Sequence, residues 1–362
     1  MAGFEGTQWA GKQMRFLLKD KSFTIGDQAD KVFAVSRSIH YGLFLAFEGI
    51  RFYCLKNNNE KLQVNFINLQ KNIDRFRRSI SFNLSSSQQN WVPEINEIEE
   101  VFIRFLKDPS MRKFLEGMAE TSAQGYLRPF TFDESQSIGV TFPDNPSIRA
   151  VVCKYDRYLG EPFSGVVVPN LVRAVGVNGT GHLKLGVNYL ISVKAVDAAK
   201  QVDPHSASAL FLDDRPYEKL EKRKVTEWDS SCCLFALKDG TIVKIPESPL
   251  ILPSVTIQGI CALLNEMGIR VVEKDMSYGE LMEKSKKNEI VAICRIGTAG
   301  ILNRAQKLIL VDSENKIIGE QVADETHDLY QKLGEARTRY WDIYQEKADP
   351  PQGVMLNKYL ID

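Results

Sequence analysis

Short apolar runs alternate with turn signals over residues 30–66. Val32–Val35 and Ile50–Leu55 have the β-branched and aromatic composition of strands. The polar stretch Lys56–Glu60 is rich in asparagine, which favours turns because its side chain hydrogen-bonds to the nearby backbone. The pattern therefore predicts two strands, the second of which runs into a hairpin turn.

The hydrophobic period then changes to that of a helix. Apolar residues recur every three or four positions behind Asn68, a residue type that caps helices. Prolines 93 and 109 bound a second segment with the same period, and residues 111–120 form a third. We therefore predict three consecutive helices.

Strand and helix patterns alternate along the rest of the chain. Strands are predicted around Tyr126–Phe130 and at Ala150–Cys153, on either side of the turn cluster Pro143–Pro146. Residues 154–165 combine glycine, proline and charge, which is typical of a linker. The remaining predicted elements are a helix at 189–201, strands near 208–212, 232–237 and 241–245, a helix at 256–268, strands at 269–273, 290–296 and 307–311, and a helix at about 323–345.

This succession of elements predicts a mixed α/β (α+β) protein of two domains. A chain of 362 residues also fits two domains of roughly 150 residues each. We expect residues 1–153 to form a smaller N-terminal α/β domain and residues 166–362 a larger C-terminal domain. The chain contains no internal repeat.

The composition narrows the class of protein. Lys and Arg total 46 and Asp and Glu total 46, so the chain lacks the basic excess of a dedicated nucleic-acid binder. Apolar residues make up 44%, too many for a disordered protein, and six cysteines are too few for a disulfide scaffold. The sequence shows neither an apolar run of about 20 residues nor a signal-peptide pattern. We therefore expect a cytoplasmic protein that binds neither nucleic acid nor membrane.

Several familiar motifs are absent or incomplete. Gly176 and Gly181 have the spacing of a phosphate-binding loop, but His182 follows them where that loop has lysine. Gly179-x-Gly181 lacks the third glycine of a dinucleotide fingerprint. The four histidines are scattered, and the adjacent Cys232-Cys233 suits neither a redox pair nor a zinc site, so no metal is predicted.

Five segments, taken in order, form a more specific signal than any one of them alone. They are Ser36–Tyr53 with its His-Tyr-Gly and Phe-Glu-Gly-Ile-Arg motifs, Gly125–Pro129 (Gly-Tyr-Leu-Arg-Pro), His182–Tyr189 (His-Leu-Lys-Leu-Gly-Val-Asn-Tyr), the group Val225–Trp228, Leu234–Phe235 and Leu252–Thr256, and Arg295–Ala299. From about residue 30 to about residue 345 the chain resembles the class IV (fold type IV) pyridoxal-phosphate enzymes, and within them the branched-chain amino acid aminotransferases. The resemblance implies a pseudo-barrel in the larger domain, pyridoxal 5'-phosphate as cofactor, and a homodimer with the site at the domain interface.

The resemblance assigns cofactor roles to individual residues. Lys184 matches the lysine that forms the Schiff base, and Tyr189 the tyrosine that hydrogen-bonds the cofactor's phenolic oxygen. Glu227 matches the carboxylate that pairs with the pyridine nitrogen and so keeps the ring an electron sink. By itself, Glu227 also fits a solvated residue after a charged run. The phosphate would be held by Arg75, Val255, Thr256, Gly297 and Thr298.

Substrate roles follow from the same resemblance. Tyr126 and Arg128 match the Tyr-Leu-Arg-Pro motif of branched-chain enzymes, in which the guanidinium would receive the side-chain carboxylate of glutamate. Tyr41, Phe47 and Tyr158 would form the apolar wall, although the sequence does not decide between Phe47 and Phe44. Thr298 and Ala299 would contact the substrate carboxylate, next to the small Gly297.

Three departures from the family pattern concern the shape of the pocket. Leu43–Ala46 contains four residues where the family usually has three, and the stretch after Glu227 is one residue longer, with Cys232-Cys233 where an asparagine is common. Ser254 stands where the family has glycine. These changes leave the cofactor residues in place but leave substrate preference open.

The predicted function is transamination of branched-chain L-amino acids with 2-oxoglutarate. One alternative is another class IV enzyme, a D-amino acid aminotransferase or an aminodeoxychorismate lyase, against which the Tyr-Leu-Arg-Pro motif argues. The other is a non-catalytic relative with the same fold. Lys184 and Glu227, both present, argue against a non-catalytic role.

Overall fold

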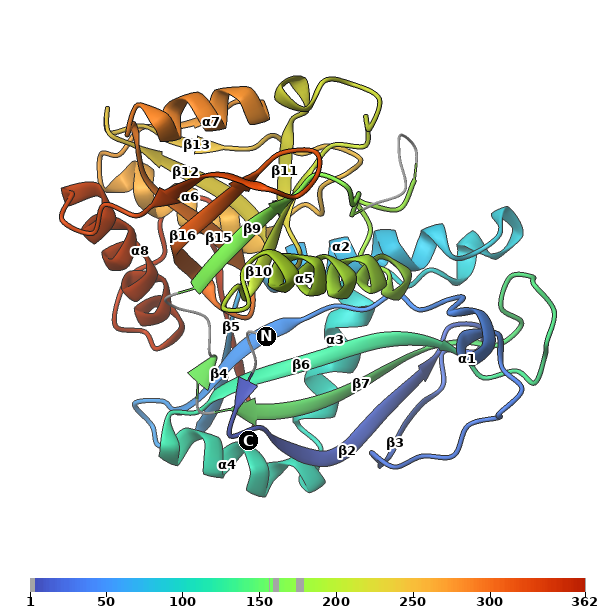
Figure 1. Ribbon diagram of the computed structural model, residues 1–362. Helices are drawn as coiled ribbons and strands as arrows, with labels where there is room; N and C mark the ends of the chain where they lie inside the picture. The colour runs from blue at the N-terminus through green and yellow to red at the C-terminus, as the bar shows by residue number, and fades with distance from the viewer. Residues whose placement is uncertain (1–3, 156, 159–162, 174–178, 362) are drawn as a thin grey trace.

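The computed structural model describes residues 4–155, 157–158, 163–173 and 179–361, and two large sheets organise them (Figure 1). The first sheet has seven strands in the order β18-β5-β4-β6-β7-β2-β3. Its strands are β2 (Gln8–Leu17), β3 (Phe23–Asp27), β4 (Ile50–Lys56), β5 (Leu62–Ile67), β6 (Gln124–Asp133), β7 (Pro146–Tyr155) and β18 (Leu356–Leu360). The neighbours within this sheet are all antiparallel.

The second sheet has nine strands and closes on itself. Its strands are β9 (Phe163–Val168), β10 (Ser208–Leu212), β11 (Val225–Trp228), β12 (Cys232–Leu237), β13 (Ile242–Lys244), β14 (Val271–Glu273), β15 (Ile290–Gly297), β16 (Ile301–Val311) and β17 (Ile317–Val322). Because β11 pairs with both β10 and β12, the circuit β11-β10-β9-β16-β15-β12 is a six-stranded barrel. The predicted pseudo-barrel and the mixed α/β class are confirmed.

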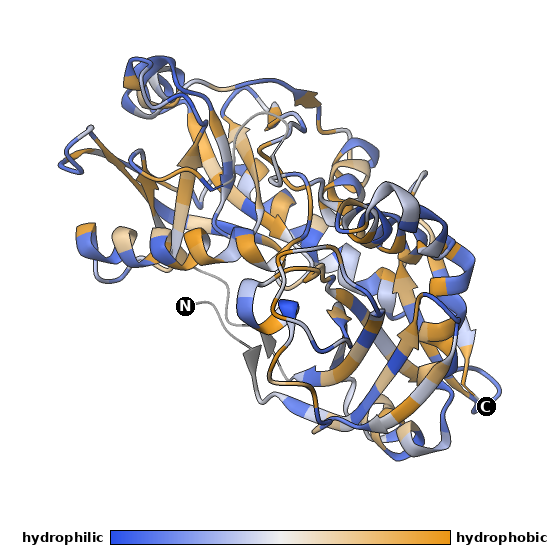
Figure 2. Cartoon of the chain, turned by 90° about the vertical axis from the view of Figure 1, so that its right-hand side faces the viewer, coloured by the Kyte–Doolittle hydropathy of each residue, from blue (hydrophilic) through white to orange (hydrophobic). Residues whose placement is uncertain are grey.

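Helices cover both sheets, and all of the longer ones bury an apolar face. They are α1 (Arg37–Tyr41), α2 (Leu69–Phe82), α3 (Ile95–Leu106), α4 (Arg112–Thr121), α5 (Tyr189–Val202), α6 (Val255–Glu266), α7 (Tyr278–Lys286) and α8 (Asp328–Tyr344). On α2, Leu69, Ile73 and Phe76 are fully buried, as expected for apolar residues repeated once per turn. In Figure 2 the apolar (orange) residues are concentrated on the strands of both sheets, whereas along the surface helices apolar and polar (blue) residues alternate. Within the described residues, no helix is long and apolar enough to cross a membrane.

Most predicted elements are confirmed, with two corrections. Val32–Val35 is not a strand: it is irregular, and Val32 and Phe33 are 44% and 54% exposed, so the apolar run has no sheet to join. Asn68 stands at the N-cap of α2 with φ of 53° but makes no capping hydrogen bond. Its side chain instead accepts the N–H of Met355 at 2.9 Å, ahead of β18. The strands β2, β3, β9, β11, β17 and β18 and the helices α1 and α7 were not predicted.

Sheet membership crosses the predicted division of the chain at two places. β18, near the C-terminus, pairs with β5 in the first sheet, which places the end of the chain beside the N-terminal half (Figure 1). β9 starts at Phe163, within the segment predicted as a linker. The boundaries at 153 and 166 remain a prediction, since the hydrogen bonding of strands does not by itself delimit domains.

Candidate active site

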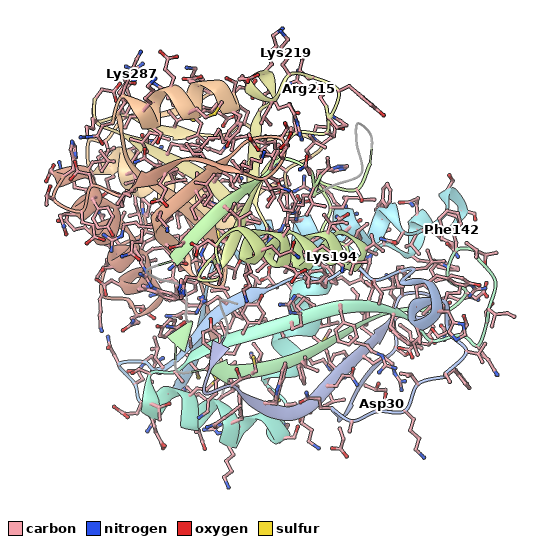
Figure 3. All side chains as sticks on the ribbon, viewed as in Figure 1. Asp30, Phe142, Lys194, Arg215, Lys219 and Lys287 are labelled. Atoms are coloured by element: carbon pink, nitrogen blue, oxygen red, sulfur yellow. The ribbon has the colours of Figure 1, made fainter. Side chains whose placement is uncertain are left out.

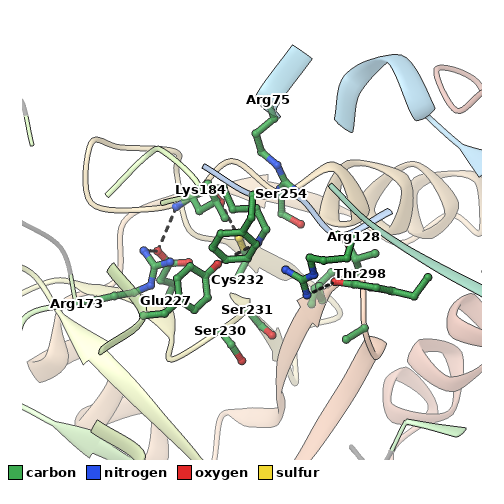
Figure 4. A pocket seen from close by; sticks show the side chains of 18 residues that line it. Arg75, Arg128, Arg173, Lys184, Glu227, Ser230, Ser231, Cys232, Ser254 and Thr298 are labelled. Atoms are coloured by element: carbon green, nitrogen blue, oxygen red, sulfur yellow. Dashed lines mark hydrogen bonds and ion pairs between the residues drawn. The ribbon is translucent and has the colours of Figure 1, made fainter. Parts of the chain in front are cut away.

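A cavity of about 210 Å³ lies where the two sheets meet, and most of the predicted site residues line it (Figure 4). Its wall consists of Phe47, Gly49, Arg75, Tyr126, Arg128, Arg173, Lys184, Tyr189, Glu227, Ser230, Ser231, Cys232, Leu252, Ser254, Ile296, Gly297, Thr298 and Ala299. Four of these side chains are cationic and one is a carboxylate, so the wall attracts an anionic ligand.

Lys184 projects into this cavity from the segment between the sheets. Its ammonium lies 3.0 Å from the hydroxyl of Tyr189 and 5.0 Å from the centre of the Phe47 ring. Burial alone would raise the pKa of the Tyr189 phenol, but the charges of Lys184 and Arg173 hold that pKa below its ordinary value. The pair therefore places an amine and an acidic phenol side by side.

Glu227 lies opposite, at the end of β11, and is 2% exposed. Its carboxylate lies 2.7 Å from a guanidinium nitrogen of Arg173 and accepts the N–H of Leu252 at 3.1 Å. Burial raises the pKa of Glu227 to about 7, although Arg173 opposes the shift. A buried carboxylate of this kind can accept a hydrogen bond from a protonated ring nitrogen of a ligand.

Arg173 is the most informative residue that the sequence reasoning missed. It is 4% exposed and its Nε has no hydrogen-bond partner within the described part of the chain. Its sequence signal is an arginine inside the apolar stretch 165–175, where a charge needs a partner. Ser230, Ser231, Cys232, Leu252, Ser254 and Ile296 also line the cavity without having been assigned to the site.

Arg75 reaches the cavity from the buried face of α2. Two of its nitrogens donate to the carboxylate of Glu48, at 2.6 and 2.8 Å, and a third donates to the carbonyl of Pro253 at 2.7 Å. Burial alone would raise the pKa of Glu48, but Arg75 holds it below its usual range. These bonds join the segment before β4, the helix α2 and the loop before α6 around one guanidinium.

The start of α6 lies beside Arg75. The Ser254 hydroxyl caps this helix by accepting the N–H of Ile257 at 3.2 Å. The N–H groups of Val255 and Thr256, the first two residues of α6, have no partner inside the helix by geometry. Ser254 lines the cavity, whereas Val255 and Thr256, both predicted to hold the phosphate, do not.

The opposite wall carries the residues predicted for substrate. Arg128 donates to the hydroxyl of Tyr126 at 3.0 Å and lies 5.0 Å from the ring centres of Tyr126 and Phe47. A Cβ on Gly49 would come within 1.8 Å of the Tyr126 hydroxyl, so the Tyr126 side chain requires glycine at that position.

The turn at Thr298 and Ala299 is held from behind by Arg51. This arginine is 1% exposed, donates to the carbonyls of Thr298, at 2.9 Å, and Ala299, and stacks on Trp341. Arg51 therefore binds both carbonyls of this turn, and both turn residues line the cavity. Ser231 faces this turn, with its hydroxyl 3.2 Å from where a Cβ of Gly297 would lie.

One predicted substrate residue, Tyr41, does not line the cavity, and another, Tyr158, has its side chain outside the described part of the structure. Tyr41 is 46% exposed on α1, and its hydroxyl donates to the carbonyl of Ile138. Tyr158 belongs to β8 (Arg157–Tyr158), which pairs with β1 (Phe4–Glu5), but its side chain lies outside the described residues. Tyr41 therefore does not line the cavity of its own chain.

The structure also decides between the two phenylalanines. Phe47 lines the cavity, whereas Phe44 is 2% exposed in the core. Phe44 has φ of 53°, the left-handed conformation, which absorbs the extra residue of Leu43–Ala46 as a local kink. None of these four residues lines the cavity, so the insertion does not narrow it.

Comparisons with known proteins agree with this geometry. The chain is 25% identical over 300 residues to a probable branched-chain-amino-acid aminotransferase of Staphylococcus aureus strain N315, covering 82% of this chain and 77% of the relative. A crystal structure of the branched-chain aminotransferase from Thermoproteus uzoniensis superposes with a TM-score of 0.68 at 20% identity, covering 93% of this chain and 96% of the other. The fold is that of the branched-chain aminotransferases.

A second solved structure carries the comparison further. The branched-chain amino acid aminotransferase from Thermobaculum terrenum, solved in its PLP-form (holo-form), has a TM-score of 0.66 at 15% identity and covers 98% of this chain and 99% of the other. No family model matches the chain. The resemblance predicted from the five sequence segments is confirmed. Within the described residues, no cluster of three or more His, Cys, Asp or Glu side chains could hold a metal ion.

Proposed function

We propose that this protein is a pyridoxal-phosphate-dependent aminotransferase that moves the amino group between branched-chain L-amino acids and 2-oxoglutarate. The observation that carries the proposal is the meeting of Lys184, Tyr189, Glu227 and Arg75 around one cavity. Relatives named branched-chain aminotransferases support the substrate class.

The cavity wall fits the proposed cofactor. Its cationic excess suits a phosphate, and the buried Nε of Arg173, without a partner among the described residues, has room for a further acceptor. Arg75 retains N–H groups beyond those bonded to Glu48 and Pro253, because a guanidinium has five. The start of α6 adds backbone N–H groups to the same anion site.

Each residue then has a definite task. Pyridoxal phosphate, when bound, supplies the electron-withdrawing ring that makes the substrate Cα acidic. Lys184 would anchor the cofactor and afterwards carry the proton to and from the substrate Cα. Tyr189, beside that amine, would donate a hydrogen bond from its hydroxyl to the phenolic oxygen of the cofactor. Glu227 would hold the ring nitrogen in its protonated form.

The opposite wall would orient the substrate. The N–H groups of Thr298 and Ala299 would bind its α-carboxylate, with Tyr126 beside them. Phe47 would contact an aliphatic side chain, and Arg128 would receive the second carboxylate of glutamate. One cavity could then take both partners of the exchange, because the guanidinium stacks on rings when no carboxylate is present.

The proposal is tested by the visible absorption spectrum of the protein mixed with pyridoxal phosphate. L-Leucine should bleach the band of the lysine-linked cofactor, and 2-oxoglutarate should restore it. A band that responds to D-alanine but not to L-leucine would favour the D-amino acid or lyase alternatives. Absence of any band would contradict the enzyme proposal and favour a non-catalytic relative.

We further propose a homodimer in the cytoplasm. The support for the dimer, besides the resemblance, is an exposed apolar patch on α1 and the 134–145 loop, where Ile138, Val140 and Phe142 are 53–71% exposed. Figure 3 labels Phe142. Tyr41 belongs to this patch, and there it would contact the cavity of the second chain. Native mass spectrometry should give the mass of two chains, and Val140→Asp should shift it to one. A wild-type monomer would contradict the proposal.

A further inference from the structure

The buried face of α2 carries a second polar residue one turn beyond Arg75. Ser79 is 0% exposed, and its hydroxyl donates to the carbonyl of Arg75 at 3.2 Å. The same hydroxyl accepts the backbone N–H of Lys184 at 3.0 Å, from a residue 105 positions away in the sequence. Ser79 does not line the cavity, so it acts on Lys184 only through the backbone.

The backbone around Lys184 is fixed on two sides. On one side its carbonyl accepts the N–H of Phe47 at 3.0 Å, and Gly186 donates to the carbonyl of Leu45 at 3.0 Å. Between these bonds, Leu185 and Ala46 form an isolated antiparallel bridge. On the other side lies α2, which reaches the segment through Ser79.

We propose that Ser79 is a positioning residue for Lys184, and that α2 thereby sets the spacing between the two ends of the site. Arg75 and Ser79 are four residues apart and so share one helix face, about 5–6 Å apart at Cβ. Arg75 points to the predicted phosphate end and Ser79 holds the lysine end. This inference rests on the proposed function, in which both ends grip one rigid cofactor.

The physical reason is that Lys184 must deliver a proton to a defined atom. Its amine stands at the end of a flexible four-carbon stem, so its range is set by where the backbone holds its Cα. A displacement of about 1 Å costs on the order of a hundredfold in rate in well-ordered sites. Loss of the Ser79 hydroxyl leaves a buried N–H without a partner, and that penalty favours opening of the segment.

The first test measures this hydrogen bond directly, on protein to which no cofactor has been added. Amide hydrogen exchange at Lys184 should be about tenfold faster in Ser79→Ala, because the lost bond weakens protection locally. Ser79→Thr keeps the hydroxyl and should exchange as the wild type does. The matched control is Ser147→Ala, which removes another fully buried hydroxyl, bonded to Glu134 at 2.6 Å, in β7 outside the cavity wall.

The outcomes separate positioning from general destabilisation. Faster exchange at Lys184 in Ser79→Ala but not in Ser147→Ala supports the proposal. Equal exchange in Ser79→Ala and wild type overturns it, and so does equal acceleration in both alanine variants. If Ser79→Ala does not fold, Ser79→Cys takes its place with the same expectation, because a thiol accepts hydrogen bonds weakly.

The second test uses the protein loaded with pyridoxal phosphate. Ser79→Ala should lower kcat for L-leucine by about tenfold or more while KM changes by less than about threefold, since proton transfer is impaired more than binding. The pH at which the visible band of the lysine-linked cofactor changes should also shift. A wild type without that band contradicts the proposed function, whereas a normal wild-type band with no shift and no kcat loss in Ser79→Ala contradicts this inference alone.

Discussion

Arg75 and Arg128 line the same cavity, but the protein holds them in different ways. Arg75 is 5% exposed and donates to two oxygens of Glu48 and to the carbonyl of Pro253. Arg128 is only partly buried. Among the described residues its guanidinium donates to Tyr126 alone and otherwise rests on two aromatic rings. The first guanidinium is fixed by three segments of the chain and the second can move.

The difference matches what each side of the cavity would bind. In the proposed function the same cofactor occupies the Arg75 side throughout, so a rigid wall loses nothing and gains alignment. The Arg128 side must accept an aliphatic side chain and then a carboxylate. A guanidinium that stacks on Phe47 and Tyr126 can serve both, because it keeps a favourable contact when the carboxylate is absent.

The largest expected effect on turnover is at Lys184. Lys184 belongs with Arg75 to the part of the cavity proposed to hold the cofactor, here called the fixed side, and the part around Arg128 is called the mobile side. Lys184→Ala should lower turnover by at least about a thousandfold, because no other lysine among the described residues lines the cavity to accept and return the proton. Steady-state assay with L-leucine and 2-oxoglutarate measures it. The control is Lys194→Ala, which removes an exposed lysine of α5 outside the cavity wall (labelled in Figure 3). Unchanged turnover in Lys184→Ala would refute the assignment.

Removing the partner of Arg75 should cost the most stability. Glu48→Gln leaves a buried guanidinium without its counter-charge, and breaking a buried ion pair costs about 3–5 kcal/mol. Urea unfolding of the cofactor-free protein measures the loss. The matched control is Asp74→Asn, on the helix that carries Arg75. The Asp74–Arg78 ion pair is about half exposed and should contribute under about 0.5 kcal/mol to the free energy of unfolding. Equal losses in the two variants would show that the fixed side is not held by this pair.

Glu227 should make the stability of the cofactor-free protein depend on pH. Burial raises its pKa to about 7 from an ordinary value near 4.5, so the folded state favours the protonated form. The resulting stability is present below pH 4.5 and is lost as the pH rises through 7. Between pH 4.5 and pH 8 the unfolding free energy of wild type should fall relative to Glu227→Gln by about 3 kcal/mol.

The comparison with Glu227→Gln isolates this titration. The glutamine variant leaves the Arg173 guanidinium unpaired, but that cost is the same at every pH, because the guanidinium stays charged. Other titrating groups are common to both proteins. Parallel pH profiles for the two proteins would mean that folding does not raise the pKa of Glu227, because the Arg173 contact cancels the effect of burial.

From the sequence, the motif residues on the fixed side could be identified, but the residues that pair with them could not. Lys184, Glu227 and Arg75 lie in short motifs that match the family pattern. Glu227 and Arg75 are buried, Lys184 is partly buried, and each has more than one partner. The partners themselves, Glu48 and Arg173, are distant in sequence from the residues they serve. Each pairing is a contact between segments 27 or more positions apart within one half of the molecule, and no local pattern encodes it.

The same reasoning explains the errors in the fold. Val32–Val35 has the composition of a strand, yet composition does not indicate whether a neighbouring strand is available. Asn68 has the residue type of a helix cap, but its oxygen is taken by Met355, from the opposite end of the chain. The motif around Tyr41 predicts a place in the cavity, while its position in one chain leaves it on the surface. In each case a long-range contact decided the outcome.

The smallest effect is expected on the mobile side. Arg128→Lys keeps the charge but loses the planar fork that stacks on rings and binds a carboxylate through two bonds. The KM for 2-oxoglutarate should rise about tenfold, equivalent to about 1.4 kcal/mol. The rate of the half-reaction with L-leucine should change by less than about twofold, because an aliphatic side chain needs no cation.

The free energy of unfolding of Arg128→Lys should stay within about 0.5 kcal/mol of wild type, since the hydrogen bond to Tyr126 is the side-chain bond that is lost. Stopped-flow measurements of the two half-reactions give the concentration dependence for 2-oxoglutarate and for L-leucine on one preparation. The L-leucine half-reaction is therefore the internal control. If both substrates are impaired equally, Arg128 is as fixed as Arg75, and the two sides of the cavity do not differ in the way their contacts indicate.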